Sequence, residues 1–153
     1  MPSQSMVKML NYWGARLLWT LVRASSFLSS LSNMNNFLGT TLLIVPPADA
    51  TAIHTLIPGS QPDGQGGFTI PCTGNATVAL TFAGISFSID PRDIAVQPVD
   101  PSNPQGTCVS GIVSGTVGGA TEWLAGDVFL KNVYFGTDAT DKTLSLAQLV
   151  KST

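Results

Sequence analysis

The fold is decided by one stretch, Phe37-Leu38-Gly39-Thr40-Thr41-Leu42-Leu43-Ile44-Val45-Pro46-Pro47. A glycine and two threonines lead into four aliphatic residues, and a Pro-Pro pair ends the run. A short apolar run bounded by Gly and Pro is typical of a buried strand that follows a tight turn. The residues before this stretch differ in composition from those after it.

The composition indicates one folded domain built mainly of β-structure. The chain has 153 residues, of which 44% are hydrophobic and only 10% are charged, so it can bury a core and is not of the disordered class. Its 15 glycines and 10 prolines favour short strands and turns over long helices.

Charge is distributed unevenly along the chain. Residues 1–48 contain three basic residues and no acid, whereas the rest holds all nine acids against four bases, a net charge of −5. Such an acidic body has no basic patch for nucleic acid, so we predict no nucleic-acid partner.

Residues 1–36 carry apolar side chains at spacings of three and four, which predicts an amphipathic helix. The stripe consists of Met6, Leu10, Trp13, Leu17, Leu21, Ala24, Leu28 and Leu31. Arg16 and Arg23 interrupt it, so it is neither a clean signal peptide nor a membrane span. A targeting or membrane-surface helix and an unrelated extension with no selected role remain open, and the second is slightly favoured. A membrane surface is an expected partner only under the first.

Residues 47–57 predict a short helix, with Pro47 in its first turn and Pro58-Gly59 at its end. The only histidine, His54, lies within it and has no Cys or second His at metal-ligand spacing. We expect it to be a surface residue of that helix, and we expect neither a metal nor a cofactor.

Alternating apolar and polar residues predict an antiparallel hairpin of Thr77–Phe82 and Ile85–Ile89, joined at Ala83-Gly84. The other predicted strands are Phe68–Cys72, Ile94–Val99, a segment within Val109–Val117, and Leu144–Val150.

The two cysteines, Cys72 and Cys108, are 36 residues apart and are not in a Cys-x-x-Cys spacing. A disulfide is favoured over two buried thiols, and it would place the chain in an oxidising compartment. There Asn75-Ala76-Thr77 would be a usable glycosylation sequon.

Residues 39–150 resemble the C-terminal lobe of a pepsin-like aspartic peptidase of the kind that fungi secrete. Gly39-Thr40-Thr41-Leu42-Leu43 resembles the continuation of the second Asp-Thr-Gly loop, and Ile70-Pro71-Cys72 with Cys108 resembles the disulfide of that lobe. The segment Trp123–Leu130, with Tyr134, resembles the family's Trp-hydrophobic-hydrophobic-Gly-Asp segment.

The resemblance implies an antiparallel β lobe that forms one side of a peptide-binding cleft. The enzyme would act on peptides or proteins, outside the cell or in the secretory pathway. Each of two lobes would contribute one aspartate, and the two carboxylates would share a proton and activate a water molecule. Phe37 occupies the position of that aspartate here, and residues 1–36 contain no Asp and are too short to replace a first lobe. We therefore expect no catalytic residue and no peptidase activity in this chain. Residues 37–153 are expected to form the C-terminal lobe, and residues 1–36 an unrelated extension.

By the same resemblance, Gly39, Thr40, Thr41 and Leu124 would line the cleft, although in the absence of the other lobe a plain turn before a strand is the favoured explanation for the first three. Trp123, Leu124 and Phe129 are expected in the core, and Gly126 is expected to allow close backbone approach. The alternative function is that of a non-catalytic binding module. Its partner would be a peptide, a missing first lobe or an intact peptidase.

Overall fold

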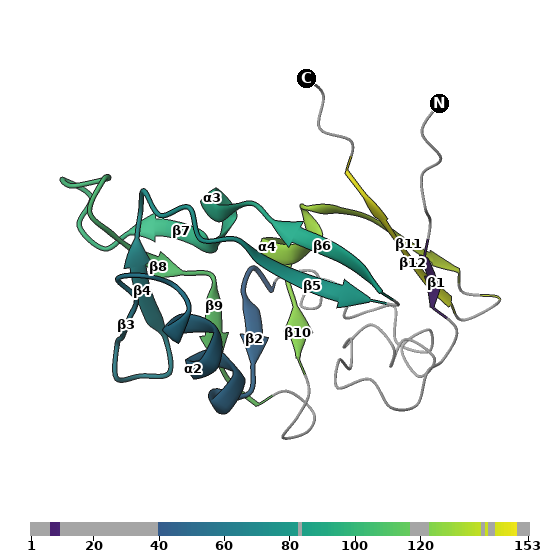
Figure 1. Cartoon of the computed structure of the whole chain (residues 1–153), viewed down its shortest axis with the longest axis horizontal. Coiled ribbons are helices and arrows are strands. Elements are labelled where there is room, and N and C mark those ends of the chain that lie inside the picture. The colour runs from purple at the N-terminus through teal and green to yellow at the C-terminus, as the bar shows by residue number, and fades with distance from the viewer. Residues whose placement is uncertain are drawn as a thin grey trace, which may run out of the picture.

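The computed structural model describes residues 7–9, 40–82, 84–116, 123–138, 140 and 143–149. Short strands dominate and the helices are short, so the expected mainly β fold is confirmed (Figure 1). The elements are, in order, β1 (Val7–Met9), β2 (Leu43–Val45), α2 (Pro47–Thr55), β3 (Gln61–Pro62), β4 (Phe68–Pro71), β5 (Val78–Phe82), β6 (Ile85–Ile89), α3 (Pro91–Ile94), β7 (Ala95–Pro98), β8 (Thr107–Ser110), β9 (Ile112–Ser114), β10 (Leu124–Ala125), α4 (Asp127–Leu130), β11 (Val133–Asp138) and β12 (Thr143–Gln148).

The stretch around Leu43–Val45 forms the central strand of a small mixed sheet. β2 pairs with β10 on one side in antiparallel fashion and with β9 on the other side in parallel fashion. Leu43 and Val45 are completely buried, as expected for an apolar run between a turn and two prolines. The other sheets of the described residues have the orders β1-β12-β11, β3-β4-β8-β7 and β5-β6.

The predicted hairpin is confirmed as β5 and β6, paired from Val78 opposite Ile89 to Phe82 opposite Ile85. Its apolar positions face the core, because the side-chain period of a strand is two. Gly84 has φ +81°, which suits glycine in the turn, while Ala83 lies outside the described residues. The Nε2 group of Gln148 donates a 3.0 Å hydrogen bond to Ser86 O and so ties β12 to the hairpin.

Among the predicted boundaries that differ from the structure are a helix end and a strand start. The helix expected to reach Ile57 ends at Thr55, and the strand expected at Ile94–Val99 is β7, preceded by the single turn of α3. Asp90 explains α3, because its carboxylate accepts a 3.0 Å hydrogen bond from Arg92 N at the helix start and Pro91 is the first helical residue.

The N-terminal helix is not present at Val7–Met9, which form β1 and pair with β12 from Val7 opposite Leu146 to Met9 opposite Leu144. The remaining residues of that predicted helix lie outside the described part of the chain. Among the residues that are described, no helix is long and apolar enough to cross a bilayer.

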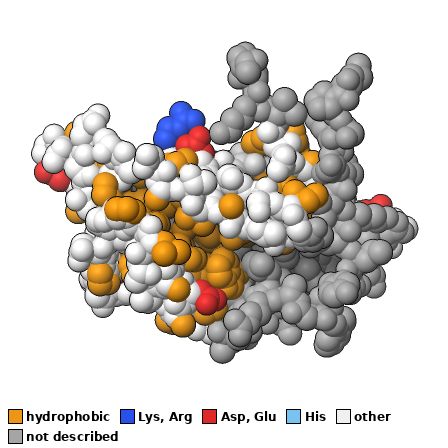
Figure 2. All heavy atoms as spheres, in the orientation of Figure 1, with side chains coloured by type: hydrophobic (Ala, Val, Ile, Leu, Met, Phe, Trp, Pro, Cys, Tyr) orange, Lys and Arg blue, Asp and Glu red, His pale blue; other side chains and the backbone are white. Residues whose placement is uncertain are grey.

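The core joins the hairpin to α4. The rings of Phe82 and Phe129 lie 5.9 Å apart, and those of Phe82 and Phe87 lie 6.0 Å apart. Phe129 is completely buried, as predicted, whereas Trp123 and Leu124 are only partly buried. On the face shown in Figure 2, hydrophobic side chains gather over the middle of the molecule and charged ones are few.

Candidate functional site

The backbone that leads into β2 is held by the backbone that leads into α4. Asp127 N donates a 3.1 Å hydrogen bond to Thr40 O, and Val128 N donates a 2.9 Å bond to Thr41 O. Both donors are backbone N–H groups at the start of α4, which have no partner within the helix itself. The position of Thr40 and Thr41 is therefore set by main-chain contacts rather than by their own side chains.

Gly126 is required by the closeness of these two segments. A Cβ atom at this position would collide with the carbonyl oxygens of Thr40 and Leu42, which are backbone atoms and cannot rotate away. The backbone of Gly126 has φ −90°, so the demand is for space and not for an unusual conformation. The predicted close backbone approach is confirmed.

A side-chain hydrogen bond braces the same region from the side of α2. Trp123 Nε1 donates a 2.9 Å bond to Asp49 Oδ2, and the contact is partly buried. Asp49 lies in the first turn of α2, directly after β2, and Trp123 directly precedes β10. The bond therefore joins the segments that flank β2 and its antiparallel neighbour.

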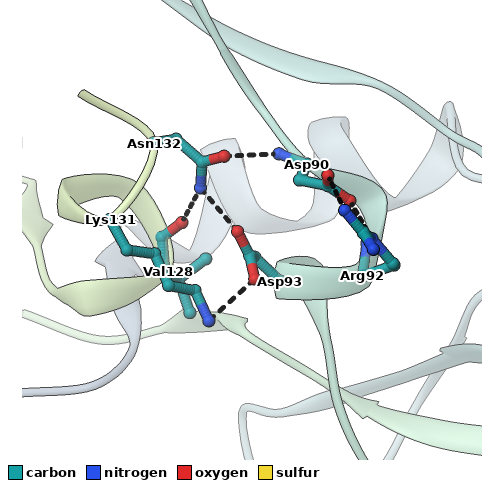
Figure 3. A network of polar contacts seen from close by, with 6 residues as sticks. All are labelled: Asp90, Arg92, Asp93, Val128, Lys131 and Asn132. Carbon is teal, nitrogen blue, oxygen red and sulfur yellow. Dashed lines mark hydrogen bonds and ion pairs between the residues drawn. The ribbon is translucent and has the colours of Figure 1, made fainter. Parts of the chain in front are cut away.

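Asn132 fixes the far end of α4 (Figure 3). Its Oδ1 atom accepts a 3.0 Å bond from Asp90 N, and its Nδ2 group donates to Asp93 Oδ2 at 2.8 Å and to Val128 O at 3.0 Å. Lys131 Nζ adds an ion pair of 2.8 Å with Asp93 Oδ1. The short helix α4 is thus anchored to α3. This anchoring holds the N-terminal end of α4, with Asp127 and Val128, against Thr40 and Thr41.

The expectation that His54 is a surface residue is wrong, since only 4% of it is exposed. Its ring stacks on Phe68 with centroids 3.8 Å apart and planes within 6°. Nδ1 lies 2.8 Å from Ala50 O and Nε2 lies 2.9 Å from Ser110 Oγ, which also accepts a 3.2 Å bond from Ile112 N. The neutral ring satisfies these contacts by donating from Nδ1 and accepting at Nε2.

The environment of His54 favours its neutral form. Burial lowers the pKa of His54 below its ordinary value of 6.5, and the hydrogen bond with the Ala50 carbonyl opposes that effect only in part. The helix sequence carried a signal for this burial, because Ala50, His54 and Ile57 recur at helical spacing and all three are buried. Sequence reasoning tested His54 only for metal-ligand spacing and missed it.

The disulfide between Cys72 and Cys108 is formed, with the two Cα atoms 4.9 Å apart. It joins the turn after β4 to β8, next to the register pair of Ile70 and Cys108. Asn75 follows Cys72 by three residues and is exposed.

Three of the expected cleft residues lie within the described part of the chain. Thr40 is partly buried, Thr41 is exposed, and Leu124 is partly buried in β10 opposite Ile44. Phe37 and Gly39 lie outside the described residues. Within the described ranges, no group of three or more His, Cys, Asp or Glu side chains gathers where it could hold a metal ion.

Comparison with known proteins identifies the family of this chain. The family described as eukaryotic aspartyl protease matches residues 4–149. The chain belongs to the eukaryotic aspartyl protease family.

Two fungal proteins are among the relatives of this chain. The aspartic-type endopeptidase ctsD of Aspergillus fumigatus is 42% identical over 110 residues, which are 71% of this chain and 22% of the relative. An aspartic protease of Phaffia rhodozyma is 36% identical over 146 residues, or 91% of this chain and 35% of the relative. The chain thus spans about a fifth to a third of the length of these two aspartyl proteases.

Main-chain contacts among the described residues build a frame around Thr40 and Thr41. Main-chain bonds place Thr40 and Thr41, Gly126 permits the close approach, and the side chain of Asp127 is exposed. Such a frame can present hydroxyl and backbone groups to an extended peptide.

Proposed function

We propose that this chain is one lobe of an aspartic-type endopeptidase, a class that hydrolyses peptide bonds in proteins, and that its 153 residues do not catalyse hydrolysis alone. The observation that carries the proposal is the backbone frame of Thr40, Thr41 and Gly126, preceded in sequence by Phe37. The frame supports a peptide-binding role, and Phe37 accounts for the loss of chemistry.

The chemical argument rests on what position 37 would have to supply. Two carboxylates that share a proton can act as base toward water and as acid toward the substrate. Phe37 has no ionisable group, and Leu38 lacks a hydroxyl that could fix a neighbouring turn. Pairing two copies of the chain would not restore the site, because each copy would bring Phe37.

The test is cleavage of casein or a fluorogenic peptide at acidic pH by the purified chain, with and without pepstatin. An intact fungal aspartic endopeptidase serves as the positive control. We expect no pepstatin-sensitive cleavage by the chain, and such cleavage would refute the proposed inactivity.

A non-catalytic binding module is the second candidate, and the exposure of Thr41 and the partial exposure of Leu124 favour it. The ligand would be an extended peptide or an intact peptidase. Amide NMR spectra recorded with a hydrolysis-resistant peptide would test peptide binding. Saturable shifts at Thr40, Thr41 and Leu124, with none at exposed Thr107 on β8, would support it, and shifts spread evenly over the surface would speak against it.

We further propose that the chain works in the secretory pathway or outside the cell. The disulfide supports this, because such bonds persist in oxidising compartments.

A further inference from the structure

A small apolar hollow opens beside the loop that follows β4. Its floor is formed by the buried side chains of Ile57, Ile70 and Ile94. Its rim includes Gly74, which is exposed, and Ala76, which is partly buried. Three buried residues of the core therefore lie directly beneath this hollow.

Asn75 lies between the two rim residues and begins the sequon Asn75-Ala76-Thr77. Asn75 and Thr77 are both exposed, and residues 74–77 have no regular secondary structure. No other residue of the described part of the chain holds the Asn75 amide or the Thr77 hydroxyl in a hydrogen bond. The acceptor amide and the hydroxyl that the sequon requires are thus free for an enzyme to engage.

The disulfide supplies an independent observation about the compartment. Cys72 precedes Asn75 by three residues and is bonded to Cys108. Oxidation of these cysteines and attachment of N-linked oligosaccharides take place in the same secretory compartment of eukaryotic cells. A chain that acquires this disulfide therefore also meets the glycosylation machinery.

From these observations we propose that Asn75 carries an N-linked glycan whose first sugar lies over the apolar hollow. The donor is an N-acetylglucosamine-terminated oligosaccharide on a polyprenyl diphosphate. Asn75 Nδ2 forms a bond to the anomeric carbon, the bond from that carbon to the diphosphate oxygen breaks, and the diphosphate leaves with the electron pair. The amide nitrogen gives up one proton to a base of the transferase. The apolar face of the sugar then covers side chains of the core at the rim between Gly74 and Ala76.

The modification is tested by making the full chain, behind a cleavable signal peptide, in a yeast secretory pathway and in translation reactions with microsomes. We expect a glycan on the natural chain and on Thr77→Ser, which keeps the sequon, and none on Thr77→Ala or Asn75→Gln. The microsome reaction scores glycan transfer even for a variant that fails to fold. A natural chain with an intact disulfide and no glycan would overturn the proposal.

The position of the first sugar is tested by two enzymatic treatments of the secreted protein. An endoglycosidase leaves one N-acetylglucosamine, whereas an amidase removes the whole glycan and converts Asn75 to aspartate. We expect the endoglycosidase product to keep the thermal unfolding midpoint of the glycosylated protein, and both the amidase product and Thr77→Ala to unfold at a lower temperature. Equal midpoints for all four proteins would show that the sugar does not cover the hollow.

Discussion

Trp123 Nε1 and Asp49 Oδ2 form a 2.9 Å hydrogen bond that links the residue before β10 to the first turn of α2. Replacing the indole by a ring without a donor, Trp123→Phe, leaves a partly buried carboxylate without this bond. We expect the free energy of unfolding to fall by about 1–3 kcal/mol, which urea denaturation measures.

The matched experiment is a double-mutant cycle with Asp49→Ala. If the two side chains stabilise the fold through this bond, the double variant loses less than the sum of the two single variants. Strictly additive losses would show that the bond does not couple α2 to the β10 segment.

The close approach at Gly126 makes a second prediction. Gly126→Ala places a methyl group against two backbone carbonyl oxygens, so the two segments must separate, and we expect a loss of about 1–3 kcal/mol in the free energy of unfolding. Gly136→Ala in β11 is the control, because the nearest atom to its Cβ lies 4.0 Å away and its φ is not positive. Equal stability of the two variants would contradict the account of the frame.

His54 predicts a pH dependence of stability. Burial holds the pKa of His54 in the folded chain below its ordinary value of 6.5, so the unfolded chain takes up the proton first as the pH falls. The contribution of the neutral ring is therefore complete above about pH 6.5 and declines below it until the folded chain is also protonated. Two carboxyl groups lie on α2 and on the loop between β3 and β4, and both already accept hydrogen bonds. Asp49 accepts one from Trp123 Nε1, and Asp63 accepts from Gln65 N and Gly67 N.

The measurement is urea denaturation at several pH values between about 7.5 and 5, above the range in which ordinary carboxyl groups titrate. His54→Gln keeps hydrogen-bonding groups but does not titrate, and no other histidine exists in the chain. We expect the natural chain to lose stability across this range and the variant to lose less. Parallel curves for the two proteins would show that His54 does not carry the dependence.

The disulfide makes the largest single contribution that we predict. Its closed loop of about 36 residues constrains the unfolded chain, so the Cys72→Ser/Cys108→Ser variant should lose about 2–5 kcal/mol in the free energy of unfolding. Adding dithiothreitol to the natural chain should reproduce this loss and should leave the double variant unchanged. A reduced chain as stable as the oxidised one would contradict the prediction.

Much of the fold was predictable because local patterns and tertiary packing agree. The hairpin of β5 and β6 follows from alternation of apolar and polar residues, and β2 follows from a four-residue apolar run between Gly and Pro. α3 was not among the predicted elements, although Asp90 followed by Pro91 is a helix-start signal that fits the observed cap.

The side-chain contacts that support the site were less predictable, because they join distant parts of the sequence. His54 meets Ser110 across 56 residues, and Trp123 meets Asp49 across 74. No local pattern identifies such a partner. Gly126 was predictable only because the surrounding segment resembles a known family, and the structure then supplied the carbonyl oxygens that exclude a side chain there.

We propose that the peptide-binding frame is intact but that the chain lacks the carboxylate that would make it a catalyst. The most direct test of this proposal is mass-spectrometric detection of peptide products after long incubation of the folded, disulfide-bonded chain with a protein substrate at acidic pH. Asp127→Asn is measured in parallel, because Asp127 is the carboxyl residue whose backbone binds Thr40. We predict no pepstatin-sensitive product from either protein, and a pepstatin-sensitive product from the natural chain would contradict the account.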